Sequence, residues 1–247
     1  MLGAGALVVA LAVSGGAGAG AQPGPDDQAP AAVASDAAPM GSSTPDASTH
    51  PSTRTGKAAK QATRVKIPEH GPGRFTRAKV DGPKVGEKNA RLLRYAVKVE
   101  RRLPYTADEI ALAVQATLSD RRSWIGGGDW RLQLVSDPGR ADFTIYLATP
   151  GTVDRYCWPL RTYGRVSCRA GNKVMLNAWR WAHGAEAYGK DVAAYREYLV
   201  NHEVGHRLGH SHVACRGKGK RAPVMMQQTK TVGLCKANPW PSPRRTG

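Results

Sequence analysis

The sequence contains no apolar run long enough to cross a membrane. Its longest apolar stretch, residues 2–13, falls short of the roughly 20 residues that a transmembrane helix needs. Small residues follow, and Ala19-Gly20-Ala21 fits the small-x-small site at which signal peptides are cut. No Lys or Arg precedes the stretch, so only the amino terminus supplies the positive charge typical of a signal peptide. We expect residues 1–21 to be a signal peptide or an N-terminal anchor of a secreted or cell-surface protein.

Cysteine is scarce, and the absence of any CxxC pair argues against a cysteine zinc cluster. An even number of cysteines in an exported protein predicts disulfides instead. The four cysteines allow three pairings, and we favour Cys157–Cys168 and Cys215–Cys235 because both close short loops. The second bridge would fix the loop around the chain's last histidine or staple the C-terminal tail. Residues 22–90 contain no cysteine, so a pro-segment there has no thiolate with which to block an active site.

Acidic residues are also few, since 19 Asp and Glu stand against 36 Lys and Arg, for a net charge of +17. Residues 61–247 hold the excess, with 33 bases against 15 acids. Such a balance attracts polyanions, and nucleic acid, anionic lipid and an acidic cell wall all qualify. A solvated basic surface that keeps an exported protein soluble would have the same composition. No Lys/Arg run is long enough to indicate a specific nucleic acid, and an anionic cell-wall polymer stays as one expected partner.

The composition divides the chain into a linker and one domain. Residues 22–72 are rich in Pro, Ala, Ser and Thr without any periodicity, which predicts a disordered linker. We expect a single folded domain over residues 73–241, a short tail at 242–247, and a monomeric protein.

Alternating apolar residues predict strands within the domain. In RYAVKVE, residues 94–100, the apolar Tyr95, Val97 and Val99 alternate with a solvent-facing set that ends at Glu100. This pattern is typical of a half-buried strand. Three more short segments predict strands: residues 130–135, 142–148 and 173–177.

Two longer segments predict helices. Residues 106–120 begin with a capping box formed by Thr106 and Glu109, and apolar residues follow at helical spacing. Residues 191–208 form the second helix. The order of strand, helix, strands and helix predicts an α+β domain with helices against one side of a sheet. One face of the second helix is shared by Val192, Tyr195, Leu199, His202 and His206.

This helix carries the motif HEVGHRLGHSH at residues 202–212, which holds four of the seven histidines of the chain. His202 and His206 stand one helical turn apart, so both imidazoles point the same way and can hold one metal ion. Glu203 lies beside such an ion without binding it, and from there it can take a proton from a metal-bound water. We therefore expect a Zn²⁺ site with Glu203 as the catalytic base.

A catalytic zinc needs a third protein ligand and one open position. Gly209 follows His206 by three residues, where the helix must stop and the chain turn with positive φ. His212 comes three residues later, and a turned chain can bring it back to the ion. His210 is a rival third ligand, but the helix would have to continue through Gly209. A histidine-rich helix end without metal is the structural alternative, although the full HExxHxxGxxH spacing rarely arises by chance.

The motif resembles the active-site helix of the metzincin clan of zinc endopeptidases. Those enzymes also have a tight turn with a methionine beneath the metal, shortly after the third histidine. Here APVMMQQ, residues 222–228, follows the motif, and Met225 matches that methionine best; otherwise it would simply fill the core. The resemblance implies a metzincin-like fold, with a mixed sheet, an active-site helix and a C-terminal methionine turn. In metzincins an edge strand beside the cleft pairs with the substrate, and residues 173–177 are either that strand or an interior one.

The domain also resembles an actinobacterial family of exported domains of unassigned function that are regarded as zincin-like peptidases. By that resemblance the zinc ligands are His202, His206 and His212, and Glu203 is the base. The matching stretches are RYAVKVE, YCWPL, SCR, VMLNAWRW, YREYLVNHEVGHRLGHSH, APVMMQQT and NPWP.

One position departs from the metzincin pattern. Some metzincins place a tyrosine two residues after the turn methionine, where it can approach the metal, and this chain has Gln227 there. Gln227, Tyr195 and Tyr198 are all candidates for a residue that stabilises the reaction's oxyanion, and the sequence does not choose among them.

These features predict a secreted zinc metalloendopeptidase that hydrolyses a peptide or protein substrate through a zinc-bound water activated by Glu203. A cell-wall-directed zinc amidase would use the same chemistry, and the basic domain would suit an anionic wall. A non-catalytic binding module with a structural zinc is the third hypothesis. A structural site has no use for a base, so Glu203 argues against it.

Overall fold

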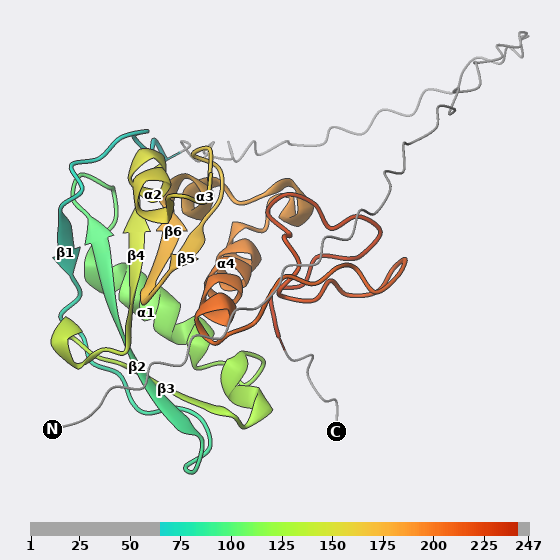
Figure 1. The fold of residues 1–247 in the computed structure, drawn as a ribbon, viewed down its shortest axis with the longest axis horizontal. Coiled ribbons are helices and arrows are strands. Elements are labelled where there is room, and N and C mark those ends of the chain that lie inside the picture. The colour runs from blue at the N-terminus through green and yellow to red at the C-terminus, as the bar shows by residue number, and fades with distance from the viewer. Residues whose placement is uncertain (1–64, 242–247) are drawn as a thin grey trace, which may run out of the picture. The chain divides into compact units, whose positions relative to one another are not determined.

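The computed structural model describes residues 65–241. The expected signal peptide at 1–21 and tail at 242–247 lie outside the described residues, as does the expected linker as far as residue 64. Within 65–241 the chain forms one six-stranded sheet and four α-helices (Figure 1). The strands are β1 (Phe75–Arg77), β2 (Arg91–Glu100), β3 (Trp130–Leu134), β4 (Phe143–Ala148), β5 (Cys168–Ala170) and β6 (Lys173–Asn177). The helices are α1 (Ala107–Leu118), α2 (Pro150–Cys157), α3 (Ala178–His183) and α4 (Val192–Arg207), with short 3-10 helices at Trp124–Gly127, Pro138–Arg140 and Glu186–Tyr188.

The sheet is mixed, with the order β1-β2-β4-β6-β5 and β3 also paired with β2. Strand β2 is parallel to β3 and β4, and β4 is parallel to β6. The short outer strands β1 and β5 are antiparallel to their neighbours. Residues 173–177 are therefore an interior strand, because β6 lies between β4 and β5, and β5 forms the edge on this side.

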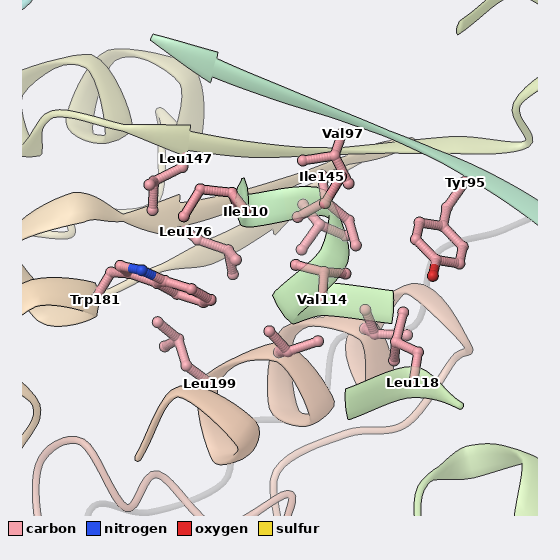
Figure 2. Packing of buried hydrophobic residues seen from close by; sticks show 14 of the residues in the cluster. Tyr95, Val97, Ile110, Val114, Leu118, Ile145, Leu147, Leu176, Trp181 and Leu199 are labelled. Atoms are coloured by element: carbon pink, nitrogen blue, oxygen red, sulfur yellow. The ribbon is translucent and has the colours of Figure 1, made fainter. Parts of the chain in front are cut away.

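One face of the sheet carries the main hydrophobic core. Apolar side chains of β2, β4 and β6 face Ile110 and Val114 of α1 and Leu199 of α4, together with Trp181 of α3 (Figure 2). Helix α1 begins at the predicted cap, since Thr106 Oγ1 accepts the Glu109 amide at 3.2 Å, and Asp191 caps α4 by accepting the Ala194 amide on Oδ1 at 2.9 Å. The structure thus confirms that the helix predicted over residues 191–208 carries the start of the histidine motif.

The opposite face of the sheet packs against α2. Tyr146 and Met175 point away from the main core because neighbours along a strand face opposite ways, and they gather with Val153 of α2. The prediction of helices on one side only holds for α1, α3 and α4 and is wrong for α2. Helix α2 has only eight residues, too few to display a helical period in the sequence.

The two disulfides join the cysteines as predicted, Cys157 to Cys168 and Cys215 to Cys235. The first ties the end of α2 to the edge strand β5, and the second closes the loop that follows the histidine motif. Paired cysteines fit an oxidising compartment such as the cell exterior. Among the described residues, no helix has the length and apolarity to span a bilayer.

Residues 65–72, which the sequence assigns to the linker, contact the domain. Ile67 packs against the main core, and the Glu69 carbonyl accepts the Gly151 amide of α2 at 2.8 Å. These residues therefore belong to the folded part of the chain. A segment without periodicity gives no sign of such contacts, because they depend on residues more than 80 positions away.

Glu100 is buried, with 1% of its surface exposed, and its expected place on the solvent face is wrong. Its Oε1 accepts the Gly73 amide at 2.7 Å and the Thr152 hydroxyl at 2.8 Å. Its Oε2 accepts the Thr149 amide at 2.8 Å and the Thr149 hydroxyl at 3.0 Å. Four donors thus replace the water that a carboxylate normally needs. The carboxylate joins the residues before β1 to the start of α2.

We predict that Glu100→Gln lowers the free energy of unfolding by about 2 to 3 kcal/mol, because an amide nitrogen would face hydrogen-bond donors in a buried site. Urea unfolding at a fixed zinc concentration measures the loss. Glu87→Gln removes a charge at an exposed position and is the matched control. Equal losses in the two variants would contradict the proposed role of Glu100.

Candidate metal centre

Helix α4 and the turn after it bring three histidines together. The ligand atoms of His202, His206 and His212 all lie within 4.8 Å of one another. His202 and His206 are one turn apart on α4, and His212 returns from beyond the helix end. His202 is buried, His206 is half-buried and His212 is exposed, so the group runs from the core to the surface.

The chain reverses at Gly209, as the sequence predicts. Gly209 has a φ of +97°, a conformation that suits glycine because it has no Cβ. The His210 amide then bonds back to the Gly205 carbonyl at 2.9 Å, which closes the helix end. The Val213 amide donates to the Met225 carbonyl at 3.2 Å and holds the returning segment. These bonds place His212 beside α4.

Backbone carbonyls fix the orientation of two of the imidazoles. The Nδ1–H of His202 donates to the Val224 carbonyl at 2.8 Å, and the Nδ1–H of His206 donates to the His210 carbonyl at 2.8 Å. Because a carbonyl can only accept, each ring must carry its proton on Nδ1 and keep the Nε2 lone pair free. The Nε2 atoms of His206 and His212 lie 3.0 Å apart.

This donor set fits a tetrahedral metal ion. Two imidazole nitrogens bound to one zinc at 2.0–2.1 Å would stand about 3.3 Å apart. The Nε2 atoms of His206 and His212 are close to that separation. Burial lowers the pKa of His202 to about 3, so the ring is neutral and able to bind a cation. Burial also lowers the pKa values of His206 and His212.

His210, the rival third ligand, lies outside this group. Its ring stacks on Trp124 with centroids 4.4 Å apart, and only its backbone carbonyl touches the site, through His206. The helix ends before Gly209, so the side chain of His210 does not lie on the face of α4 that carries His202 and His206. The side chain lines a separate, larger pocket of about 440 Å³ that contains none of the three clustered histidines.

Glu203 lies on α4 beside the histidines and is only 4% exposed. Its Oε2 has no hydrogen-bond partner among residues 65–241. Burial raises the pKa of this carboxyl to about 8. Burying a carboxyl oxygen without a hydrogen-bond partner lowers the stability of the fold. Such groups with shifted pKa values are typical of sites that carry out acid–base catalysis.

Met225 lies in a tight turn that packs against α4. The Met226 amide donates to the Pro223 carbonyl at 2.9 Å, which closes a four-residue turn. The turn contacts α4 at Gly205, where an added Cβ would overlap the Met225 sulfur and approach Trp124 Cζ2 to 2.6 Å. The same turn presents the Val224 carbonyl to His202. The disulfide between Cys215 and Cys235 brackets this segment.

The three candidates for an oxyanion-stabilising residue differ in their surroundings. Tyr198 is buried, and its hydroxyl donates to the Met226 carbonyl and accepts the Gln228 amide, each at 2.9 Å. The Tyr195 hydroxyl pairs with Thr229 Oγ1 at 3.0 Å. Both tyrosines thus hold the loop that follows Met225. Gln227 is exposed and lines the cleft beside the histidines.

The clustered histidines and Glu203 open onto one cleft of about 250 Å³. The edge strand β5 and the loop before it form part of its wall, with Leu160, Arg161 and Arg169. Lys230, from the loop after Met225, lines it as well. No pattern in the sequence indicates that these residues line the site. Leu160, Arg161 and Arg169 precede the motif by more than 30 positions, and the pairing of β5 with β6 brings Arg169 to the cleft.

Residues 62–243 match the family described as "Protein of unknown function (DUF3152)", and the chain belongs to that family. No curated protein and no solved structure matches the chain.

We predict that Gly205→Ala destabilises the protein by about 1 to 3 kcal/mol through overpacking against Met225 and Trp124. Alanine is a better helix former than glycine by about 1 kcal/mol, so helix propensity alone would make Gly205→Ala stabilising. Urea unfolding measures the change. The double variant Gly205→Ala/Met225→Ala should lose less free energy of unfolding than the two single variants lose in sum. A stabilised Gly205→Ala protein would contradict this packing.

Proposed function

We propose that the protein is a zinc-dependent metallopeptidase of metzincin-like architecture that acts outside the cell. The observation that carries the proposal is the juxtaposition of three histidines with a buried, unpartnered carboxylate at the wall of an open cleft. A divalent cation would be held by His202, His206 and His212. Imidazole ligands in a tetrahedral arrangement favour zinc over magnesium or calcium, which prefer oxygen.

Zinc, when bound, supplies Lewis acidity, which makes water a nucleophile near neutral pH and polarises a carbonyl oxygen. Glu203 carries out the two proton transfers. Its Oε2 accepts the proton of the attacking water, because no other group in the described domain occupies that oxygen. The protonated carboxyl then donates to the nitrogen of the leaving amine.

Strand β5 is the element that we assign to substrate positioning. Within residues 65–241 it is the edge strand on this side of the sheet, and there it pairs only with β6. An extended peptide could add to its free edge through main-chain hydrogen bonds, which hold a substrate without regard to its side chains. Arg169 at the middle of β5 lines the cleft, so a peptide in this place would pass the histidines.

A zinc amidase acting on the cell wall is the alternative that one observation favours. The cleft is lined by Arg161, Arg169 and Lys230, and a basic cleft would also accept an anionic wall fragment. We favour the peptidase because the free edge of β5 suits an extended peptide. A purely structural zinc is less consistent with the cleft, since structural sites are closed by a fourth protein ligand.

We predict that the purified protein binds one zinc per chain and that His212→Ala weakens binding at least about a hundredfold. His210→Ala, two residues earlier, is the matched control and should bind zinc like the wild type. Competition with a fluorescent zinc chelator measures both affinities. Equal losses in the two variants, or an undiminished affinity in His212→Ala, would refute this ligand set.

We predict that Glu203→Gln keeps its zinc but loses peptide cleavage by a factor of about 100 to 10,000, the usual contribution of a general base. The zinc-loaded protein and the variant are incubated with a diverse peptide library, and mass spectrometry identifies the products. Chelation of the metal should abolish the same products. If Glu203→Gln with full zinc occupancy cut the library as well as the wild type, the proposed mechanism would be wrong.

A further inference from the structure

The bases in the cleft are not neutralised by the protein. Arg161, Arg169 and Lys230 are exposed, and Glu203, the only acid that lines the cleft, is buried. Among residues 65–241 the single salt bridge joins Arg122 to Asp120. The cleft therefore presents uncompensated positive charge to any molecule that enters it.

Other bases of the domain are used differently. The guanidinium of Arg180 bonds the carbonyls of Arg165 and Gly184, and Arg196 bonds the carbonyl of Trp181 and covers the ring of the same residue. Those side chains hold the fold together. Neither the Arg169 side chain nor the Lys230 side chain has a hydrogen-bond partner or an aromatic ring to cover among the described residues, so both are available to a ligand.

Two of the cleft bases line the same cleft as the clustered histidines. Arg169 and Lys230 form its wall together with His206 and His212. They come from separate elements, since Arg169 belongs to β5 and Lys230 to the loop that follows Met225. Positive charge thus borders the histidine group from the sheet edge and from the C-terminal loops.

We propose that the cleft selects peptides that carry a carboxylate next to the bond that is cut. This inference rests on the peptidase function proposed above and names the substrate class of the same site. The carboxylate comes either from an Asp or Glu side chain or from a free C terminus. Both present the same oxygens to Arg169 and Lys230, and a guanidinium binds such a group through two parallel N–H donors.

The test begins with the sequence that the protein cuts fastest in the peptide library. Matched peptides are made with Glu, Gln or Lys next to the cut bond, each with an amidated or a free C terminus. We expect kcat/KM to be about tenfold higher for a carboxylate peptide than for the Lys peptide, because two exposed charge pairs contribute up to about fivefold each and so at most about 25-fold together. The amidated and free-acid series tell the two sources apart.

Charge reversal provides the matched comparison. Arg169→Glu combined with Lys230→Glu should lower the ratio of carboxylate to Lys peptide by at least about tenfold. Lys218→Glu makes a single reversal at an exposed position that lines neither pocket, and it should leave the ratio unchanged. A preference that survives the double reversal, or that Lys218→Glu removes equally, would overturn the inference.

A binding measurement separates this inference from the proposed function. Zinc-loaded Glu203→Gln protein is titrated with fluorescent Glu and Lys peptides, and fluorescence anisotropy gives the dissociation constants. Tighter binding of the Glu peptide that depends on Arg169 and Lys230 would support carboxylate selection even if no peptide were cleaved. Equal cleavage and equal binding of both peptides would overturn carboxylate selection and leave the peptidase standing.

Discussion

The site depends on one local constraint, the reversal of the chain at Gly209. Helix α4 places His202 and His206 on one face, but it ends at Arg207, so His212 must return from beyond the helix. The left-handed conformation of Gly209 allows that return within three residues. The carbonyls of Val224 and His210 then fix the rings, and Met225 packs under the helix. Without the turn, His212 would lie beyond reach of the other two histidines.

The local parts of this arrangement could be predicted from the sequence. The spacing within residues 202–212 contains the helix, the glycine and the ligands in one short segment, so each follows from geometry along the chain. The two disulfides were likewise predictable from loop length. The strands β2, β3, β4 and β6 follow from their apolar patterns. The function itself is a proposal, because the chain's family has no assigned activity.

The remaining features depend on contacts between distant parts of the chain. The alternating pattern of β2 predicts that Glu100 faces solvent, but in the structure Gly73, Thr149 and Thr152 surround its carboxylate. Helix α2 has only eight residues and β5 only three, so neither shows a recognisable period in the sequence. Sheet pairing alone brings Arg169 to the cleft. Such features carry no periodic signal in the sequence.

The central claim is that three histidines hold one zinc ion and leave a coordination position open. X-ray absorption spectroscopy at the zinc K edge on the zinc-loaded protein tests this claim most directly. The account predicts three imidazole nitrogens at about 2.0–2.1 Å and at least one oxygen ligand from solvent. A shell of four protein ligands, or one that contains sulfur, would contradict it.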